Sequence, residues 1–108
     1  MSLIEEHCEA LAAGTPPLTP EQAAGLAQQT PAWALAEASI TREFQFTSFR
    51  RAIEFVRRLA ELAEAENHHP DIHIYYNRVQ LELSSHRIGG LTRNDFILAA
   101  KIDRLVEA

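Results

Sequence analysis

Residues 48–76, SFRRAIEFVRRLAELAEAENHHPDIHIYY, change their pattern of apolar side chains at Pro70. Before this proline, apolar residues recur every three to four positions, as expected for one face of a helix spanning residues 48 to about 66. The predicted apolar face consists of Phe49, Ala52, Ile53, Val56, Leu59, Ala60 and Ala63. After Pro70, apolar and polar residues alternate, which is the period of a half-buried strand. The stretch therefore predicts a long amphipathic helix that is followed directly by a strand.

Similar signals place further elements before this stretch. A capping box that begins at Thr19, with a proline at the first helical position, predicts a helix that stops before Pro31. The alternation over residues 40–46 predicts a strand that pairs with a shorter one at 33–37. Arg42 falls on the apolar side of the longer strand and is the one discord in its pattern.

The pattern after the stretch completes an α+β domain. Residues 72–84 alternate as strands, and Asn77-Arg78 fits either a bend within one long strand or a turn between two. A second capping box, Thr92 through Asp95, predicts the start of a final amphipathic helix. Because each strand has one apolar face, we expect an antiparallel sheet with helices packed on one side. The other face would meet solvent or another subunit.

The composition limits the class of protein and its partners. Residues 1–108 fit a single domain, in which residues 1–17 are interpreted as a weakly ordered arm or one short helical turn. The formal charge of −5 disfavours nucleic acid and anionic membranes as partners. Cys8 is the single cysteine, and no run approaches the ~20 apolar residues of a spanning helix. We therefore expect a soluble, cytoplasmic protein.

Three histidines surround Pro70, and a metal site is the first interpretation to weigh. His69 and His73 have the spacing of ligands on one helical face, but the proline disfavours a helix between them. In an extended chain, His69, Asp71 and His73 share a side and form a conceivable ligand set. No cysteine pair supports zinc, so metal binding is the weaker hypothesis.

Proton transfer explains the arrangement better, because imidazole titrates near neutral pH. His68 and His69 follow the C-terminus of the long helix, whose dipole favours a protonated imidazole. Glu64 lies one turn before His68 and either orients it or belongs to the charged face. His86 follows the last strand and can return to the same sheet edge, which would supply a pocket with both an acid and a base. The histidines that we interpret as structural or incidental are His7 and His73.

A longer pattern extends over about residues 18–106. The residues that carry it are Trp33, Ile40-x-Arg42-x-Phe44-x-Phe46, Glu64-x-x-x-His68-His69-Pro70-Asp71, Tyr76-Asn77-Arg78-Val79, His86, Gly89-Gly90-Leu91-Thr92, Asp95-Phe96 and Leu98-Ala99-Ala100-Lys101-Ile102-Asp103. This pattern resembles the pterin-4a-carbinolamine dehydratases. The resemblance also accounts for Arg42, which the alternation of apolar residues does not explain.

The resemblance implies a small α+β subunit with a four-stranded antiparallel sheet that assembles into homodimers or homotetramers. It implies a hydro-lyase that converts 4a-hydroxytetrahydrobiopterin to quinonoid dihydropterin and water, with no metal or organic cofactor. This reaction would recycle the pterin of aromatic amino acid hydroxylases. Members of the family also serve in animals as dimerisation partners of a homeodomain transcription factor, so a non-catalytic interaction module of the same fold is the alternative function.

The resemblance also assigns roles to individual residues. The family's three active-site histidines map onto His68, His69 and His86. We expect His69 and His86 to be most important for the rate, and His68 to grip the pterin or shuttle a proton for it. The residues expected to support the site or bind substrate are Glu64, Pro70, Asp95 and Trp33.

Two positions depart from the family pattern. Asn67 stands where many members have an acidic residue, and Ile72 stands where many have an aromatic one. Asn67 supplies no negative charge to the neighbouring imidazoles, so we expect the orienting role to fall more on Glu64. Both departures affect the expected rate and pterin preference rather than the class of reaction.

Overall fold

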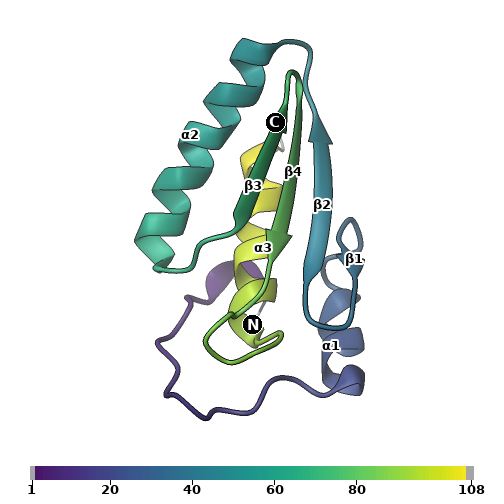
Figure 1. Cartoon of the computed structure of the whole chain (residues 1–108), viewed down its shortest axis with the longest axis vertical. Helices are drawn as coiled ribbons and strands as arrows, with labels where there is room; N and C mark the ends of the chain where they lie inside the picture. The colour runs from purple at the N-terminus through teal and green to yellow at the C-terminus, as the bar shows by residue number, and fades with distance from the viewer. Residues whose placement is uncertain (1, 107–108) are drawn as a thin grey trace.

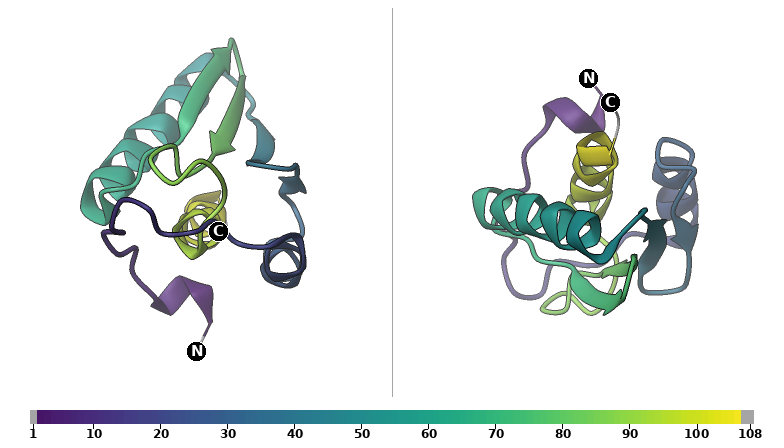
Figure 2. Two further views of the ribbon diagram at one scale, coloured as in Figure 1. Left: turned by 60° about the horizontal axis from the view of Figure 1, so that its bottom comes forward. Right: turned by 90° about the horizontal axis from the view of Figure 1, so that it is seen from above.

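The computed structural model of the chain describes residues 2–106 and confirms the α+β class. One antiparallel sheet has the order β1-β2-β4-β3 and contains β1 (Ala34–Leu35), β2 (Ile40–Gln45), β3 (Asp71–Tyr75) and β4 (Arg78–Leu83). The helices are the 3-10 turn η1 (Leu3–Glu5), α1 (Pro20–Ala27), α2 (Phe49–Glu66) and α3 (Arg93–Val106). Helices α2 and α3 pack on the same side of the sheet, while α1 lies beside β1 (Figures 1 and 2).

The segment over residues 72–84 forms a hairpin rather than one bent strand. Tyr75 pairs with Arg78, so only two residues connect β3 to β4. The first of them, Tyr76, has a positive φ of 57° and belongs to the turn, not to the strand as the alternation suggested. The second, Asn77, donates its side-chain amide to the Phe46 carbonyl at 3.0 Å. This bond ties the turn to the end of β2.

Helix α2 follows its predicted bounds, but its buried face is shifted. The residues that this helix buries are Ala52, Phe55, Leu59, Ala63 and Glu66. Phe55 contacts the ring of Phe44 on β2, with ring centroids 4.8 Å apart. Phe49 is 50% exposed, because it lies in the first turn of α2 beyond the core and stacks on Tyr76 of the hairpin turn. Its predicted place in the core was therefore wrong, as was that of the exposed Ala60.

Arg42 is explained by a partner on α3. Its guanidinium bonds to the carboxylate of Asp103 and lies 4.2 Å from the centre of the Phe44 ring. The indole nitrogen of Trp33 donates to the same Asp103 oxygen at 2.8 Å. An inward-pointing cation is tolerated here because a carboxylate and an aromatic face replace its water. The group holds the sheet to α3.

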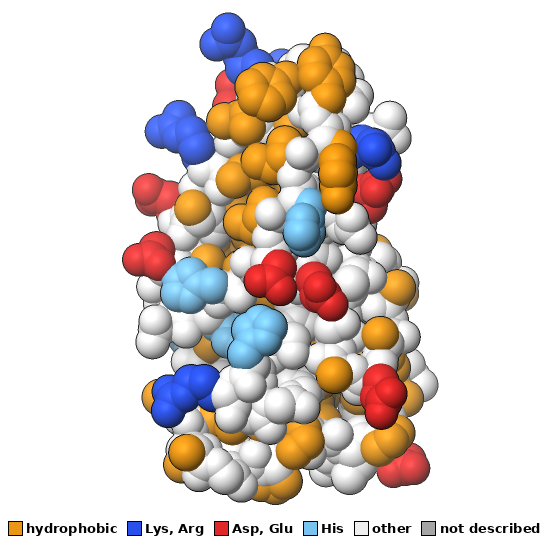
Figure 3. All heavy atoms as spheres, viewed as in Figure 1, with side chains coloured by type: hydrophobic (Ala, Val, Ile, Leu, Met, Phe, Trp, Pro, Cys, Tyr) orange, Lys and Arg blue, Asp and Glu red, His pale blue; other side chains and the backbone are white. Residues whose placement is uncertain are grey.

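The sheet buries an apolar face against the helices. The face toward the helices is formed by the buried residues Ile40, Phe44, Val79, Leu81 and Leu83. β3 is an edge strand, so Ile72 and Ile74, opposite Leu81 and Val79, remain 36% and 39% exposed. Figure 3 shows hydrophobic side chains gathered where α2 begins and the hairpin turns.

Among residues 2–106, no helix combines the length and hydrophobicity needed to cross a membrane.

We predict that Asp103→Ala lowers the free energy of unfolding by about 2–3 kcal/mol, because it leaves the Arg42 charge and the Trp33 N–H without their partner. The matched control is Glu43→Ala, which breaks an exposed pair with Arg78 and should cost less than about 1 kcal/mol. Urea unfolding with an unchanged m-value measures both. Equal losses in the two variants would contradict this account of Arg42.

Candidate active site

The end of α2 determines where the two adjacent histidines point. Asn67 adopts the left-handed conformation with a φ of 52°, and the His68 amide donates back to the Ala63 carbonyl at 3.1 Å. Asparagine tolerates this conformation better than most residues with a side chain, so it closes the helix and redirects the chain. Pro70 follows and prevents any return to helix before β3. His68 and His69 therefore leave α2 in different directions.

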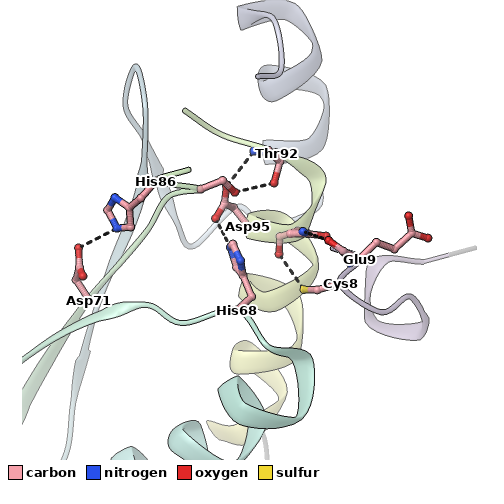
Figure 4. A network of polar contacts seen from close by, with 9 residues as sticks. Cys8, Glu9, His68, Asp71, His86, Thr92 and Asp95 are labelled. Carbon is pink, nitrogen blue, oxygen red and sulfur yellow. Dashed lines mark hydrogen bonds and ion pairs between the residues drawn. The ribbon is translucent and has the colours of Figure 1, made fainter. Parts of the chain in front are cut away.

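His68 turns inward and contacts a buried carboxylate at the start of α3. Its Nε2 donates to Asp95 Oδ1 at 2.6 Å, and the Asp95 side chain has no solvent exposure (Figure 4). The other oxygen of Asp95 accepts from the Thr92 amide and from Ser85 Oγ, each at 2.9 Å. The capping bond to Thr92 was predicted, but the same carboxylate also anchors an imidazole. His68 itself is only 14% exposed.

His69 and His86 are more exposed than His68, and each also faces a carboxylate. His69 Nε2 donates to Glu64 Oε2 at 2.6 Å. Glu64 therefore orients His69 and not His68, because the turn at Asn67 swings His68 toward α3. His86 Nε2 lies 3.8 Å from Asp71 Oδ2 at the start of β3 (Figure 4). The side chains of His69 and His86 are 53% and 71% exposed, so a ligand can reach both.

Two glycines shape the loop that carries His86. Gly89 has a φ of 84°, a conformation that strains other residues. A side chain at Gly90 would place its Cβ 2.9 Å from the Cβ of Pro17, so the N-terminal segment can pass only because residue 90 has none. The Leu18 amide then donates to the Leu91 carbonyl at 2.8 Å. The loop is thereby held against residues 17 and 18.

The three histidines line one cavity of about 300 Å³. Its other walls are the loop over residues 84–88, Asn94, and residues 9–11 of the N-terminal segment. Imidazoles and carboxylates lie together in the middle of the face shown in Figure 3. The cavity joins apolar surface from Leu11 and Ile88 to three imidazoles, so it can hold a flat heterocycle and exchange protons with it.

Other residues from the predicted site lie elsewhere. Trp33 is 4% exposed in the core and does not line the histidine cavity, and Pro70 only positions the chain between the histidines and β3. His73 projects from β3 opposite Gln80 and is also outside the cavity. Within residues 2–106, no three histidine, cysteine or acidic side chains are grouped to hold a metal ion. The alternative set of His69, Asp71 and His73 is therefore not assembled.

The N-terminal segment, expected to be a weakly ordered arm, is bonded to the end of α2. Glu66 accepts from the Cys8 amide at 2.7 Å and from His7 Nδ1 at 2.8 Å. Burial acts to raise the pKa of Glu66, but these bonds and the nearby Lys101 outweigh it and hold that pKa below its usual value. In Figure 2 the segment runs from the flank of α3 past the end of α2 to α1.

Sequence reasoning missed four contributions to this site. Asp71 as the partner of His86, Ser85 as a donor to Asp95, Asn94 and the wall formed by residues 9–11 were all unexpected. The Ser84-Ser85-His86 run was a usable signal, because small hydroxyl side chains next to a histidine can hold a carboxylate. The arm carried no comparable signal in its residues.

Comparison with known proteins identifies the family to which this α+β domain belongs. The sequence pattern of the family described as pterin 4 alpha carbinolamine dehydratase matches residues 16–105. A protein of Rubrobacter xylanophilus is 45% identical over 104 residues, covering 95% of this chain and 97% of its own. A protein of Methylococcus capsulatus is 44% identical over 106 residues, which cover 96% of this chain and 93% of that protein. Both carry the name "Putative pterin-4-alpha-carbinolamine dehydratase". The chain belongs to the pterin-4-alpha-carbinolamine dehydratase family.

Solved structures agree with this assignment. A Brucella melitensis protein described as a transcriptional coactivator/pterin dehydratase superposes with a TM-score of 0.80 at 30% identity, covering 84% of this chain and 99% of its own. A pterin dehydratase-like protein described as a RuBisCO assembly factor shares the fold, with a TM-score of 0.57 at 23% identity over 68% of this chain and 84% of its own. The fold is thus found in proteins whose descriptions differ.

We predict that Cys8 is nearly inert to alkylation at pH 8. Burial, followed by the negative charge of Glu66, raises the pKa of this thiol to about 12. The thiolate fraction at pH 8 is then roughly 10³-fold below that of an ordinary cysteine, and reactivity should keep rising with pH up to about 12. Iodoacetamide labelling followed by mass spectrometry measures the rate. Labelling as fast as in urea-unfolded protein would contradict the docked position of the arm.

Proposed function

We propose that this chain dehydrates 4a-hydroxytetrahydrobiopterin to quinonoid dihydropterin by acid–base catalysis with histidine. The observation that carries the proposal is that three imidazoles, each facing a carboxylate, surround one cavity in a member of this family. Groups that can donate and accept protons near neutral pH are what this elimination needs.

The proposed step breaks the bond between C4a of the pterin and its hydroxyl oxygen. The electron pair leaves with the oxygen, which takes a proton from an acid and departs as water. The ring nitrogen next to C4a gives its proton to a base, and its electron pair forms the new C=N bond. Atoms and electrons balance with the pterin and two imidazoles alone, so the proposal includes no metal or organic cofactor.

His69 and His86 are the proposed acid–base pair. Both are exposed and line the cavity, and a carboxylate lies near the Nε2 of each, Glu64 at 2.6 Å from His69 and Asp71 at 3.8 Å from His86. In His69 the bond from Nε2 to Glu64 leaves Nδ1 as the nitrogen that can exchange a proton with substrate. His68 is held by the buried Asp95 and is proposed to grip the pterin or shuttle a proton for it. Each transfer would contribute about 10²–10⁴-fold to the rate.

The proposed setting is the cytoplasmic recycling of the pterin used by aromatic amino acid hydroxylases. We also propose that the chain forms a homo-oligomer. Ile72, Ile74, Tyr75 and Tyr76 are 36–71% exposed on the edge strand and its turn, close to the half-exposed Phe49. Apolar side chains gathered on a strand that has a free edge favour association with another chain.

The same exposed apolar surface supports the second candidate, a non-catalytic interaction module. The Brucella melitensis relative is described as both a coactivator and a pterin dehydratase. A module of this kind would need the hairpin surface formed by Ile72, Ile74, Tyr75 and Tyr76, and none of these residues lines the histidine cavity. Variants of the cavity can therefore separate the two functions.

Under the catalytic proposal, the double variant His69→Ala/His86→Ala should lower kcat by at least about 10³-fold, because both proton-transfer groups are lost. The exposed positions of both side chains predict unchanged folding and assembly. Quinonoid dihydropterin formation and light scattering measure the two properties on the same protein. The matched control is His73→Ala, which should retain full activity. Wild-type turnover in the double variant would remove the catalytic assignment.

Asp95→Asn should lower kcat by roughly 10- to 100-fold, because His68 loses the carboxylate that fixes its tautomer and orientation. Ser85→Ala removes another bond to the same carboxylate but leaves the contact with His68. We expect this second variant to lose stability and to keep most of its activity. Steady-state kinetics and thermal unfolding of both variants make the comparison. Equal loss of activity in the two would mean that Asp95 acts through stability alone.

A further inference from the structure

The N-terminal segment closes one side of the histidine cavity. Glu9, Ala10 and Leu11 line it opposite the loop that carries His86, and Leu11 is half-buried. The family pattern begins only at residue 16, so this wall lies outside the stretch that the family pattern matches. This wall of the cavity is thus supplied by residues that precede the family pattern.

Asn94 binds this wall to the N-terminal end of α3. Its side-chain oxygen accepts from the Glu9 amide at 3.0 Å, and its side-chain nitrogen donates to the Glu9 carbonyl at 2.8 Å. The Asn94 side chain thereby pairs with both backbone groups of residue 9, as a neighbouring strand would. Asn94 is 8% exposed and directly precedes Asp95. The wall is therefore bonded to the residue that directly precedes Asp95, the carboxylate that holds His68.

Contacts outside the histidine cavity hold the rest of the segment. Glu6 accepts two bonds from the Arg93 guanidinium, at 2.7 and 2.6 Å. Lys101 donates to the Ile4 carbonyl at 3.0 Å, and the side chain of Leu3 is buried in the core. Such bidentate and buried contacts reduce the freedom of the segment before any ligand arrives. The segment is therefore fixed to the folded domain before residues 9–11, and Leu18 is bonded to Leu91 after them.

We propose that residues 9–11 form the binding wall for the pterin ring and determine how tightly the substrate is held. Leu11 offers an aliphatic side chain, and Ile88 offers another, in a cavity whose remaining groups are mostly polar. A flat heterocycle gains by covering such apolar surface while its nitrogens and hydroxyl face the imidazoles. This inference rests on the proposed dehydratase function.

The first test replaces Leu11 by serine. Because the wall contacts substrate and transition state alike, Leu11→Ser should raise KM for 4a-hydroxytetrahydrobiopterin about five- to tenfold and change kcat less than about twofold. The matched control is Ala12→Ser, an exposed neighbour outside the cavity, which should behave as wild type. Identical KM values in the two variants would overturn the inference.

The second test moves the wall without altering any residue that lines the histidine cavity. Arg93→Glu places two negative charges together and should raise KM, whereas the swap Glu6→Arg/Arg93→Glu should restore most of the loss. A merely structural role of the pair would change stability and leave KM unchanged, and that result would count against the inference. The alkylation rate of Cys8 reports directly on whether the segment is docked.

A binding measurement separates the failure of this inference from the failure of the proposed function. Wild-type protein should bind 7,8-dihydrobiopterin, and hydrogen exchange at residues 9–11 should slow when it does. Wild-type binding and turnover with no protection at these residues, and no KM change in the variants, would overturn only the role of the wall. Wild-type protein that neither binds this pterin nor accelerates the dehydration would overturn the proposed function and this inference with it.

Discussion

Asp95 brings a charge into the protein interior, and the arrangement of the site depends on how that charge is satisfied. Its carboxylate accepts from the Thr92 amide, Ser85 Oγ and His68 Nε2, with no exposure to solvent. A buried carboxylate that lost one of these donors would be costly, so the three donors must stay together. They come from the start of α3, the end of β4 and the end of α2. One side chain therefore fixes the relative positions of the segments that carry His68 and His86.

The order and type of the elements could be predicted because local signals were strong. The Thr19 capping box and the change of period at Pro70 both appear in the structure as the sequence suggested. The misplaced residues were those whose environment depends on distant segments. Phe49 continues the apolar stripe of α2 but lies beyond the core, and Tyr76 alternates correctly but occupies a turn. Periodicity reports which side of an element is apolar, but not how far the core extends along it.

The site was predictable in its histidines and less so in their partners. Spacing and family resemblance singled out His68, His69 and His86, and all three line one cavity. Helical spacing suggested Glu64 as a partner for His68. The left-handed turn at Asn67 instead places His69 beside Glu64 and His68 beside Asp95. Asn67 thus acts on the site through its backbone conformation. The wall at residues 9–11 was beyond prediction, because its contacts join positions more than 80 apart in the sequence.

The exposed side chains of the hairpin do not line the histidine cavity, so chemistry and association can be studied independently. We propose that the imidazoles around the cavity dehydrate a pterin carbinolamine. The most direct test follows quinonoid dihydropterin formation from 4a-hydroxytetrahydrobiopterin with purified wild-type protein and with buffer alone. We expect the wild-type protein to accelerate the dehydration by at least about 10²-fold, which is the lower end for one positioned proton-transfer group. A rate equal to that in buffer, with folded protein, would contradict it.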